Sequence, residues 1–240
     1  MWQGRTVSVV LPTYNEKDSI RRSIVEFEQS GYVDEIIVVN NNAAPGTSAE
    51  VAQTSAREVY EPRQGYGFAC QRGLCEASGD YIVLSEPDGT FSGSDILKLL
   101  AYSEGWDVVL GSRTAKGFIW QDANMGAFLR WGNWAVAKLI ELLFNTTNLT
   151  DVGCTMRLIK RTSLRQIQAD FTVGGSHFGP QMILLAVHKR LHVVQIPVNY
   201  QPRVGKSMAT GSRVKAIRIG LRMILMVLVF RIQTWLRLGV

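Results

Sequence analysis

Two carboxylates, Glu86 and Asp88, stand two residues apart in the stretch LSEPDGTF, directly after the apolar run YIVL. A proline lies between them and a glycine follows, so the chain is expected to turn as it leaves a buried strand. Two such acids can hold a divalent cation against a negatively charged substrate, or they can form an ordinary solvated turn. An isolated Glu-x-Asp turn is usually only solvated, so the surrounding elements must decide.

Polar, loop-like segments follow four apolar runs that are rich in β-branched residues. The runs at 6–12, 35–40, 80–86 and 106–112 predict strands, and they lead into PTYNE, NNNAAPG, SEPDG and GSR. Ligands of a parallel sheet gather at the carboxyl ends of its strands. The sequence therefore places a site at that edge of the sheet, with the two acids in it.

Strand and helix patterns alternate through the first half of the chain, which predicts an α/β fold with a mainly parallel central sheet and helices on both sides. Helices are predicted at 15–31, 45–56, 65–79 and 94–105, with a short strand at 57–61. Later elements are a long apolar helix at 125–144, a strand-like segment at 150–161, a helix at 177–190, a strand from 191 that leads into a basic loop, and a final helix at 213–238.

The composition is that of one globular domain with an appendage, since the chain has 240 residues and an apolar content of 46%. Its three cysteines form no CxxC pair and its three histidines have no ligand spacing, so a disulfide scaffold and a zinc site are not expected. The N-terminus runs directly into a strand pattern, so we expect no signal peptide.

The charge is unevenly distributed along the chain. Residues 171–240 contain ten Lys or Arg and no Asp or Glu, whereas residues 1–170 contain 16 basic and 20 acidic residues. A basic C-terminal third indicates a polyanionic partner, either nucleic acid or an anionic membrane surface. No nucleic-acid-binding motif is present, and the apolar C-terminal segment disfavours that partner.

The final helix is predicted to be amphipathic. At 100° per residue, one arc of the helix contains Lys215, Arg218, Arg222, Gln233 and Arg237, and the roughly opposite arc contains Ile217, Leu221, Ile224, Leu228 and Trp235. Only eight residues separate Arg222 from Arg231, so an ordinary spanning helix is not expected. We interpret residues 211–240 as a helix lying in the membrane interface, with its cations among lipid phosphates. The alternative is a terminal helix packed on the domain or in an oligomer interface.

Several motifs, in order, resemble family 2 glycosyltransferases with the GT-A fold. These are SVVLPTYNE, IIVVNNN, GYGFACQRGLCEASGDYIVLSEPDGTF and DVVLGSR. The later segments LTDVGCTMRLIKR and IPVNYQPRVGKS resemble the branch that transfers sugars to polyprenyl or dolichyl phosphate. The resemblance implies a GT-A domain over residues 1–210, followed by the C-terminal helix at 211–240.

The resemblance implies a nucleotide-sugar site that depends on Mg²⁺ or Mn²⁺, which would neutralise the diphosphate leaving group. Metal ligands would come from Glu86, Asp88 and Thr90, with Asp88 counted as catalytic. The donor would contact Pro12, Tyr14, Glu16, Asn40, Gln64, Glu86 and Arg113.

Two positions depart from the family pattern, which usually has Asp where Glu86 and Asn40 stand. The longer Glu86 side chain would contact ribose or act from an outer shell, leaving Asp88 as the principal ligand. The Asn40 carbonyl can accept the same base hydrogen bond as a carboxylate, without its charge. Asn41 and Asn42 are interpreted only as turn residues.

The acceptor site is implied by residues of the later motifs. Asp151 matches a family acid near the acceptor, and it would be the general base for a sugar hydroxyl or a positioning group for a phosphate. Contacts to the acceptor phosphate or to the donor diphosphate are expected from Arg157, Arg203, Lys206 and Ser207.

The expected function is an inverting hexosyltransferase, peripheral at the cytoplasmic face of the membrane, that transfers sugar from UDP or GDP to a polyprenyl-phosphate carrier for cell-envelope glycans. One alternative is a transferase that extends a surface polysaccharide or a lipid-linked oligosaccharide. Another is a non-catalytic homologue that binds nucleotide sugar or membrane. The sequence leaves open whether a membrane protein anchors the chain or whether copies of it associate.

Overall fold

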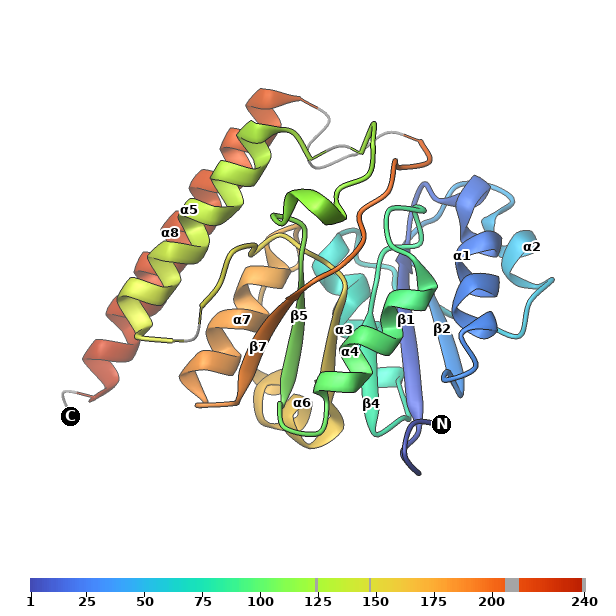
Figure 1. Ribbon diagram of the computed structural model, residues 1–240, viewed down its shortest axis with the longest axis horizontal. Coiled ribbons are helices and arrows are strands. Elements are labelled where there is room, and N and C mark those ends of the chain that lie inside the picture. Colours follow the sequence, from blue (N-terminus) through green and yellow to red (C-terminus); the bar gives the residue numbers. More distant parts are fainter. Residues whose placement is uncertain (124, 147, 206–211, 239–240) are drawn as a thin grey trace.

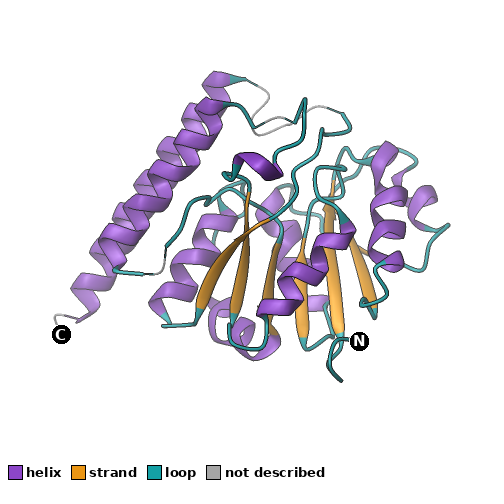
Figure 2. Ribbon diagram, in the orientation of Figure 1, coloured by secondary structure: helices purple, strands orange, loops and turns teal. Residues whose placement is uncertain are grey.

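A single seven-stranded sheet forms the centre of the computed structural model, which describes residues 1–123, 125–146, 148–205 and 212–238 (Figure 1, Figure 2). The strand order is β3-β2-β1-β4-β6-β5-β7. The strands are β1 (Val7–Thr13), β2 (Glu35–Asn40), β3 (Arg57–Tyr60), β4 (Tyr81–Leu84), β5 (Val108–Ser112), β6 (Arg157–Lys160) and β7 (Val193–Pro197).

The sheet is mainly parallel, as predicted. Strand β1 pairs in parallel with β2 and β4, β2 with β3, and β5 with β7. Strand β6 is antiparallel to both of its neighbours, β4 and β5. The carboxyl ends of β1, β2, β4 and β5 therefore lie at one edge, where the polar segments were expected to meet.

Helices cover both faces because successive strand residues point to opposite sides of the sheet. Val9 and Leu11 of β1 belong to one core, together with α1 (Lys17–Gln29), α2 (Thr47–Val51) and α4 (Ile96–Tyr102). Val10 belongs to the other core. That core includes residues of α3 (Tyr66–Glu76), α6 (Arg161–Ile167) and α7 (Phe178–His188). Short 3₁₀ turns lie at η1 (Gly93–Asp95), η2 (Lys116–Phe118) and η3 (Gln168–Asp170). The predicted α/β fold is confirmed.

Two long helices, α5 (Ala127–Phe144) and α8 (Arg213–Leu238), lie side by side at the β7 end of the sheet (Figure 1). Val227 and Met223 of α8 are buried in the same core as Val136 and Ile140 of α5. The rings of Phe144 and Phe230 stand 5.9 Å apart, centroid to centroid. The C-terminal helix is therefore packed along the domain over part of its surface.

The strand-like segment predicted at 150–161 is wrong in its first half, since β6 begins only at Arg157 and α6 begins at Arg161. Residues 151–156 instead form a loop that folds against α5. Gly153 explains this path, because a Cβ at this position would lie 2.4 Å from the side-chain oxygen of Asn133 and 2.9 Å from Nη2 of Arg113.

Helix α3 can cross β1 and β2 closely because Gly73 has no side chain. A Cβ there would lie 2.2 Å from Cγ1 of Val10 and 2.8 Å from Cγ2 of Val39. We therefore expect Gly73→Ala to lower the free energy of unfolding by about 1–3 kcal/mol, through overpacking of a rigid strand face. Urea denaturation followed by circular dichroism would measure the loss.

Gly132→Ala in α5 is the matched control, because no atom lies within 4 Å of the added methyl group. In a helix interior this change should raise stability by up to about 1 kcal/mol. Equal unfolding midpoints for Gly73→Ala and the wild type would contradict the close crossing of α3.

Candidate active site

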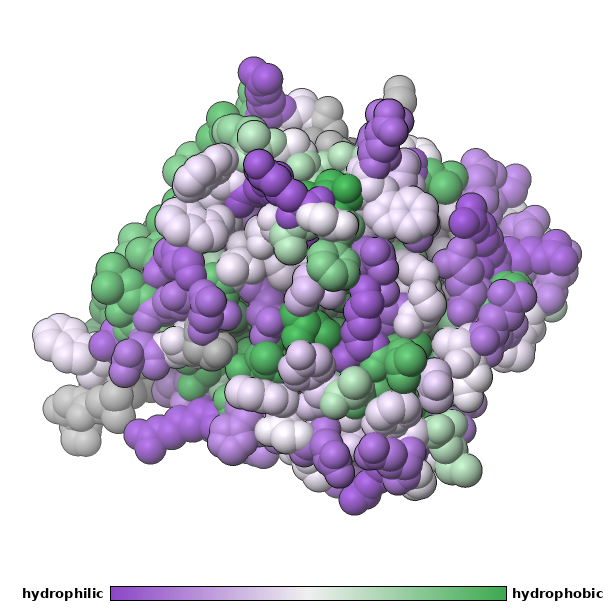
Figure 3. Space-filling model, viewed as in Figure 1, coloured by the Kyte–Doolittle hydropathy of each residue, from purple (hydrophilic) through white to green (hydrophobic). Residues whose placement is uncertain are grey.

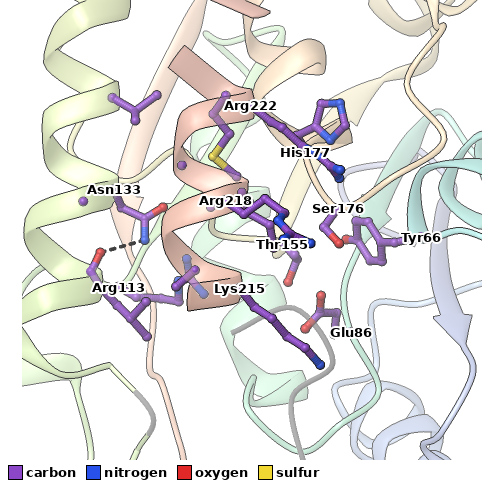
Figure 4. A pocket seen from close by; sticks show the side chains of 18 of the residues that line it. Tyr66, Glu86, Arg113, Asn133, Thr155, Ser176, His177, Lys215, Arg218 and Arg222 are labelled. Atoms are coloured by element: carbon purple, nitrogen blue, oxygen red, sulfur yellow. Dashed lines mark hydrogen bonds between the residues drawn. The ribbon is translucent and has the colours of Figure 1, made fainter. Parts of the chain in front are cut away.

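A cavity of about 800 Å³ lies where the carboxyl edge of the sheet meets α5 and α8. Seven residues predicted from the sequence line it together, although they come from five separate segments. These residues are Pro12, Tyr14, Glu16, Gln64, Glu86, Arg113 and Arg203. Figure 4 shows part of this lining, with Glu86 and Arg113 drawn as sticks.

The acidic turn after β4 is fixed by hydrogen bonds from both sides. The Ser19 hydroxyl of α1 donates to the carbonyl oxygen of Pro87 at 2.7 Å. The backbone N–H and the hydroxyl of Thr90 donate to Oδ1 of Asp88 at 2.9 and 2.5 Å. Gly89 adopts a φ of +79°, in the left-handed region that favours glycine. Asp88 is thus fully buried, and its second carboxylate oxygen remains for another partner.

Arg203 supplies the positive charge at this turn. Its Nη1 lies 2.7 Å from Oδ2 of Asp88 and 3.7 Å from Oε2 of Glu86, and its Nη2 lies 3.4 Å from Oε1 of Glu16. The backbone holds this arrangement, because the N–H of Val204 donates to the carbonyl oxygen of Asp88 at 2.9 Å. One guanidinium therefore joins the loops after β1 and β4 to the segment after β7.

The pKa values of Glu86 and Arg203 are both shifted at this turn. Burial and the nearby charge of Asp88 raise the pKa of Glu86 to about 8, although Arg203 acts against this rise. Burial by itself lowers the pKa of Arg203, but the attraction of Asp88, Glu86 and Glu16 outweighs burial and the pKa lies above its ordinary value. The raised pKa of Glu86 reflects the crowding of carboxyl groups, and a cation placed among them would favour the charged form of Glu86.

The acidic turn can supply only part of the coordination shell of a divalent cation, so a bound substrate would have to supply the remaining ligands. Within the described ranges there is no group of three or more His, Cys, Asp or Glu residues arranged to hold a metal. However, Oδ2 of Asp88 accepts no well-aligned hydrogen bond, and its only ion-pair partner among the described residues is Nη1 of Arg203 at 2.7 Å, so a cation bound here would share or take over that contact. Hard oxygen atoms such as those of Asp88 and Glu86 suit Mg²⁺ or Mn²⁺, whose other ligands commonly include substrate phosphates. Asp88 and Thr90 are both buried and outside the cavity lining, so Glu86 is the predicted metal ligand that lines the cavity.

Asp151 and Arg113 form a buried bidentate ion pair. Oδ2 of Asp151 accepts from the backbone N–H and Nε of Arg113, both at 2.9 Å, and Oδ1 accepts from Nη2 at 3.0 Å and from the N–H of Gly153 at 2.9 Å. Burial raises the pKa of Asp151, but Arg113 more than offsets this, so the pKa lies below its ordinary value. A carboxylate engaged by four donors is a weak base, so this geometry favours the positioning role over the general-base role.

The loop after β2 differs from the expected arrangement. Asn40 is outside the cavity lining, because its Nδ2 donates to Oε1 of Glu58 at 2.7 Å and its Oδ1 accepts from the N–H of Ala43 at 2.8 Å. Asn41 is the residue of this loop that lines the cavity. It is buried, its Nδ2 donates to two carbonyl oxygens of the 61–63 segment, and its Oδ1 accepts from the N–H of Gly65 at 2.8 Å. Asn41 is buried, whereas Asn40 is half-buried and Asn42 is exposed. The sequence of three consecutive Asn residues does not show which of them is buried.

Of three further residues predicted to contact the acceptor, the structure describes only Arg157, which is outside the cavity lining. Arg157 is 2% exposed, and its guanidinium donates to the backbone carbonyl oxygens of Gly179 and Cys154, which is a structural role. Its contact with an acceptor stays a prediction. Lys206 and Ser207 lie outside the described residues.

Several cavity-lining residues were missed as site residues. They are Tyr66, Thr155 and His177 from the domain, and Lys215, Arg218 and Arg222 from α8 (Figure 4). The spacing of the α8 cations already placed them on one arc of the helix, but only the packing shows which surface this arc faces. Burial, and then the charge of Arg222, lower the pKa of His177.

Solved structures share this architecture. A crystal structure of glucosyl-3-phosphoglycerate synthase from Mycobacterium tuberculosis, in complex with Mn²⁺, UDP and glucosyl-3-phosphoglycerate, matches with a TM-score of 0.74. The match covers 95% of this chain and 80% of that one, at 20% sequence identity. At this identity the likeness concerns the fold.

Curated relatives are similar along most of the sequence. An uncharacterized glycosyltransferase of Mycobacterium tuberculosis is 30% identical over 213 residues, which cover 87% of this chain and 92% of the relative. A dolichyl-phosphate hexose transferase of Haloferax volcanii is 25% identical, covering 84% and 85% of the two chains. A dolichyl-phosphate beta-glucosyltransferase of Trichomonas vaginalis is 23% identical, covering 95% and 75%.

The family model for glycosyl transferase family 2 matches residues 8–168, which include the sheet from β1 to β6 and the acidic turn. The sequence motifs, the mainly parallel sheet and the relatives agree with this match. The chain is therefore a glycosyltransferase that belongs to glycosyl transferase family 2.

Proposed function

We propose that the protein transfers a hexose, with inversion, from a UDP- or GDP-sugar to a polyprenyl phosphate at the cytoplasmic membrane surface. The observation that carries this proposal is the composition of the cavity. Its lining combines Glu86 and Arg203 at the acidic turn with apolar residues of α5 and α8, among them Leu129, Val136 and Leu221. An acceptor with a charged head and an apolar tail suits this combination better than a saccharide does.

The dolichyl-phosphate transferases of Haloferax and Trichomonas support the same class of acceptor. The Mn²⁺ and UDP bound in the structural neighbour support a divalent cation and a nucleotide-diphosphate donor. We place the cation at Asp88, with Glu86 beside it. When bound, a divalent cation neutralises the charge that develops on the leaving diphosphate.

The chain's own residues bind and orient the two substrates. Tyr14 and Pro12 form a wall for the base, and Arg203 and Arg113 line the cavity as diphosphate donors. In the reaction, an acceptor phosphate oxygen forms a bond to the anomeric carbon on the face opposite the diphosphate, and the bond from that carbon to the diphosphate breaks. The attacking phosphate is already anionic, so no general base is required.

A saccharide acceptor is the second candidate function, and it would require a base to deprotonate the hydroxyl group. The ion pair of Asp151 with Arg113 argues against that residue as the base. We therefore assign Asp151 the task of holding Arg113 in the cavity wall.

We also propose that residues 211–240 attach the domain to the membrane. Hydrophobic atoms form a band over α5 and α8 at one edge of the molecule (Figure 3). On α8, the exposed apolar side chains include Leu225 at 62%, Ile232 at 56% and Trp235 at 68%. By length and composition Arg213–Leu236 could cross a membrane, but its packing along α5 and the charges at Arg222 and Arg231 favour a helix in the interface.

The acidic turn is tested by Asp88→Asn. We expect sugar transfer to fall by about 100-fold or more, because the amide cannot balance the charge of a divalent cation. The assay is the transfer of label from UDP- and GDP-hexoses to polyprenyl phosphate, with Mn²⁺ or Mg²⁺, counted in the organic extract. Chelation with EDTA should have the same effect on the wild type.

Asp18→Asn is the control, since this acid is exposed in the first turn of α1. Full transfer by Asp88→Asn, or full transfer in EDTA, would rule out the metal-dependent reaction. Hydrolysis of donor with no label in the lipid would instead favour the saccharide acceptor.

The role of Asp151 is tested by Asp151→Asn. Removing one partner of a buried pair should cost about 3–5 kcal/mol of stability at pH 7, because the Arg113 guanidinium loses its counter-charge. The pKa of Asp151 is lowered, so this stabilisation is present above the ordinary Asp pKa of roughly 3.9 and is lost as the pH falls through the lowered value. Thermal melts from pH 3 to pH 8 would measure it.

A positioning role also predicts the kinetics of Asp151→Asn. The KM for the donor should rise, and the pH profile of kcat should keep its shape. A variant of normal stability that loses the acidic limb of the kcat profile would identify Asp151 as a base instead.

Membrane attachment is tested by Leu225→Ser combined with Ile232→Ser. Each lost side chain should weaken partition into phosphatidylglycerol vesicles by about 10-fold, because each removes exposed apolar area. Vesicle co-sedimentation is the measurement. Leu97→Ser in α4 is the control, because this leucine is 40% exposed on the other face of the sheet. Unchanged sedimentation of the double variant would contradict attachment through α8.

A further inference from the structure

Three cations of α8 face the cavity and are not used by the donor site. Lys215, Arg218 and Arg222 line it and lie along one side of the helix, as their spacing of three and four residues requires (Figure 4). Helix α8 contains no acidic residue. Among the described residues, no ion pair forms with any of these three cations, so their charge is available to an anionic ligand.

Two hydroxyl groups of the domain also line the cavity. Oγ1 of Thr155 is buried and has no hydrogen-bond partner among the described residues, and Oη of Tyr66 is buried with only the weakly bonding thiol of Cys70 beside it. Figure 4 shows both side chains near Glu86, beside the α8 cations. Buried hydroxyls in this state cost free energy until a ligand pairs with them. A ligand here would therefore offer several acceptor atoms and carry negative charge.

The cavity continues from these polar groups into an apolar wall. Phe128 and Leu129 of α5 and Ile217 and Ile224 of α8 line it. Phe128 and Ile217 are about half exposed, at 51% and 50%, so this wall is open on one side, and a free inorganic anion would leave it uncovered. The combination fits a phosphate monoester of a long apolar alcohol.

We propose that Lys215, Arg218 and Arg222, together with the hydroxyls of Thr155 and Tyr66, form the subsite that binds the phosphate of the acceptor. This inference rests on the proposed function, since it names the groups that would hold the acceptor of that reaction. It makes α8 a wall of the active site as well as a candidate membrane contact. The acceptor phosphate would then lie in the same cavity as the donor diphosphate, which we place near Glu86 and Arg203.

The test measures binding of farnesyl phosphate to the full chain in detergent, without donor or metal. We expect farnesyl phosphate to bind at least about 10-fold more tightly than farnesol, because the cations contact only the phosphate. Arg218→Gln and Arg222→Gln should each weaken the binding of farnesyl phosphate by about 10-fold and leave the binding of farnesol and of UDP unchanged. Arg213→Gln is the matched control, because it removes the same charge from α8 outside the cavity lining.

Equal binding of farnesyl phosphate by Arg218→Gln, Arg222→Gln and the wild type would overturn the subsite, provided that circular dichroism shows all three folded. Displacement of farnesyl phosphate by dihexanoyl phosphatidic acid at equal concentration would identify a phospholipid-headgroup site and would also overturn the acceptor assignment. A further outcome is that the variants lose binding of farnesyl phosphate while the wild type transfers no sugar to polyprenyl phosphate. In that case the proposed function is wrong and the phosphate subsite is supported.

Discussion

The guanidinium of Arg203 is the contact on which the active-site edge depends. It reaches Asp88 at 2.7 Å and lies within 4 Å of Glu86 and Glu16, so it joins two acidic loops that would otherwise repel each other to its own segment after β7. Three carboxylates gathered at one sheet edge would be costly without a counter-charge. The cluster to which our proposal assigns a divalent cation is thus kept compatible with a folded chain by the charge of Arg203.

The arrangement of loops at the active-site edge also depends on the strand order of the sheet. Strand β4 lies beside β1, so the acidic turn stands next to the end of β1, which contains Pro12, and the loop after it, which contains Glu16. The antiparallel strand β6 lies between β4 and β5, and the loop that precedes it brings Asp151 to Arg113. The functional groups of this glycosyltransferase therefore come from strand ends that are distant in sequence and adjacent in the sheet.

The side chains of helix α8 lie in three different environments around the helix. Met223 and Val227 are buried against the domain, Arg218 and Arg222 line the cavity, and Leu225 and Trp235 are exposed. A helix that only covered the core would leave no apolar face exposed, and a helix that only lay on a bilayer would need no buried face. In our proposal this division lets one helix attach the domain to the membrane and hold the acceptor phosphate at the active site.

The sequence alone determined the fold class, most of the strands and helices, and the family. Periodic apolar runs and polar strand ends are local patterns, and five or six motifs in order are specific. It also identified Glu86 and Asp88, because acids directly after a buried strand stand out in the sequence, and Arg203 through the family resemblance of the segment that contains it. Only the tertiary structure showed that Asn41 and not Asn40 faces the cavity, that Asp151 is neutralised by Arg113, and that the α8 cations face the cavity. These features depend on which residues distant in the chain fill the space around each side chain, and neither periodicity nor spacing records that.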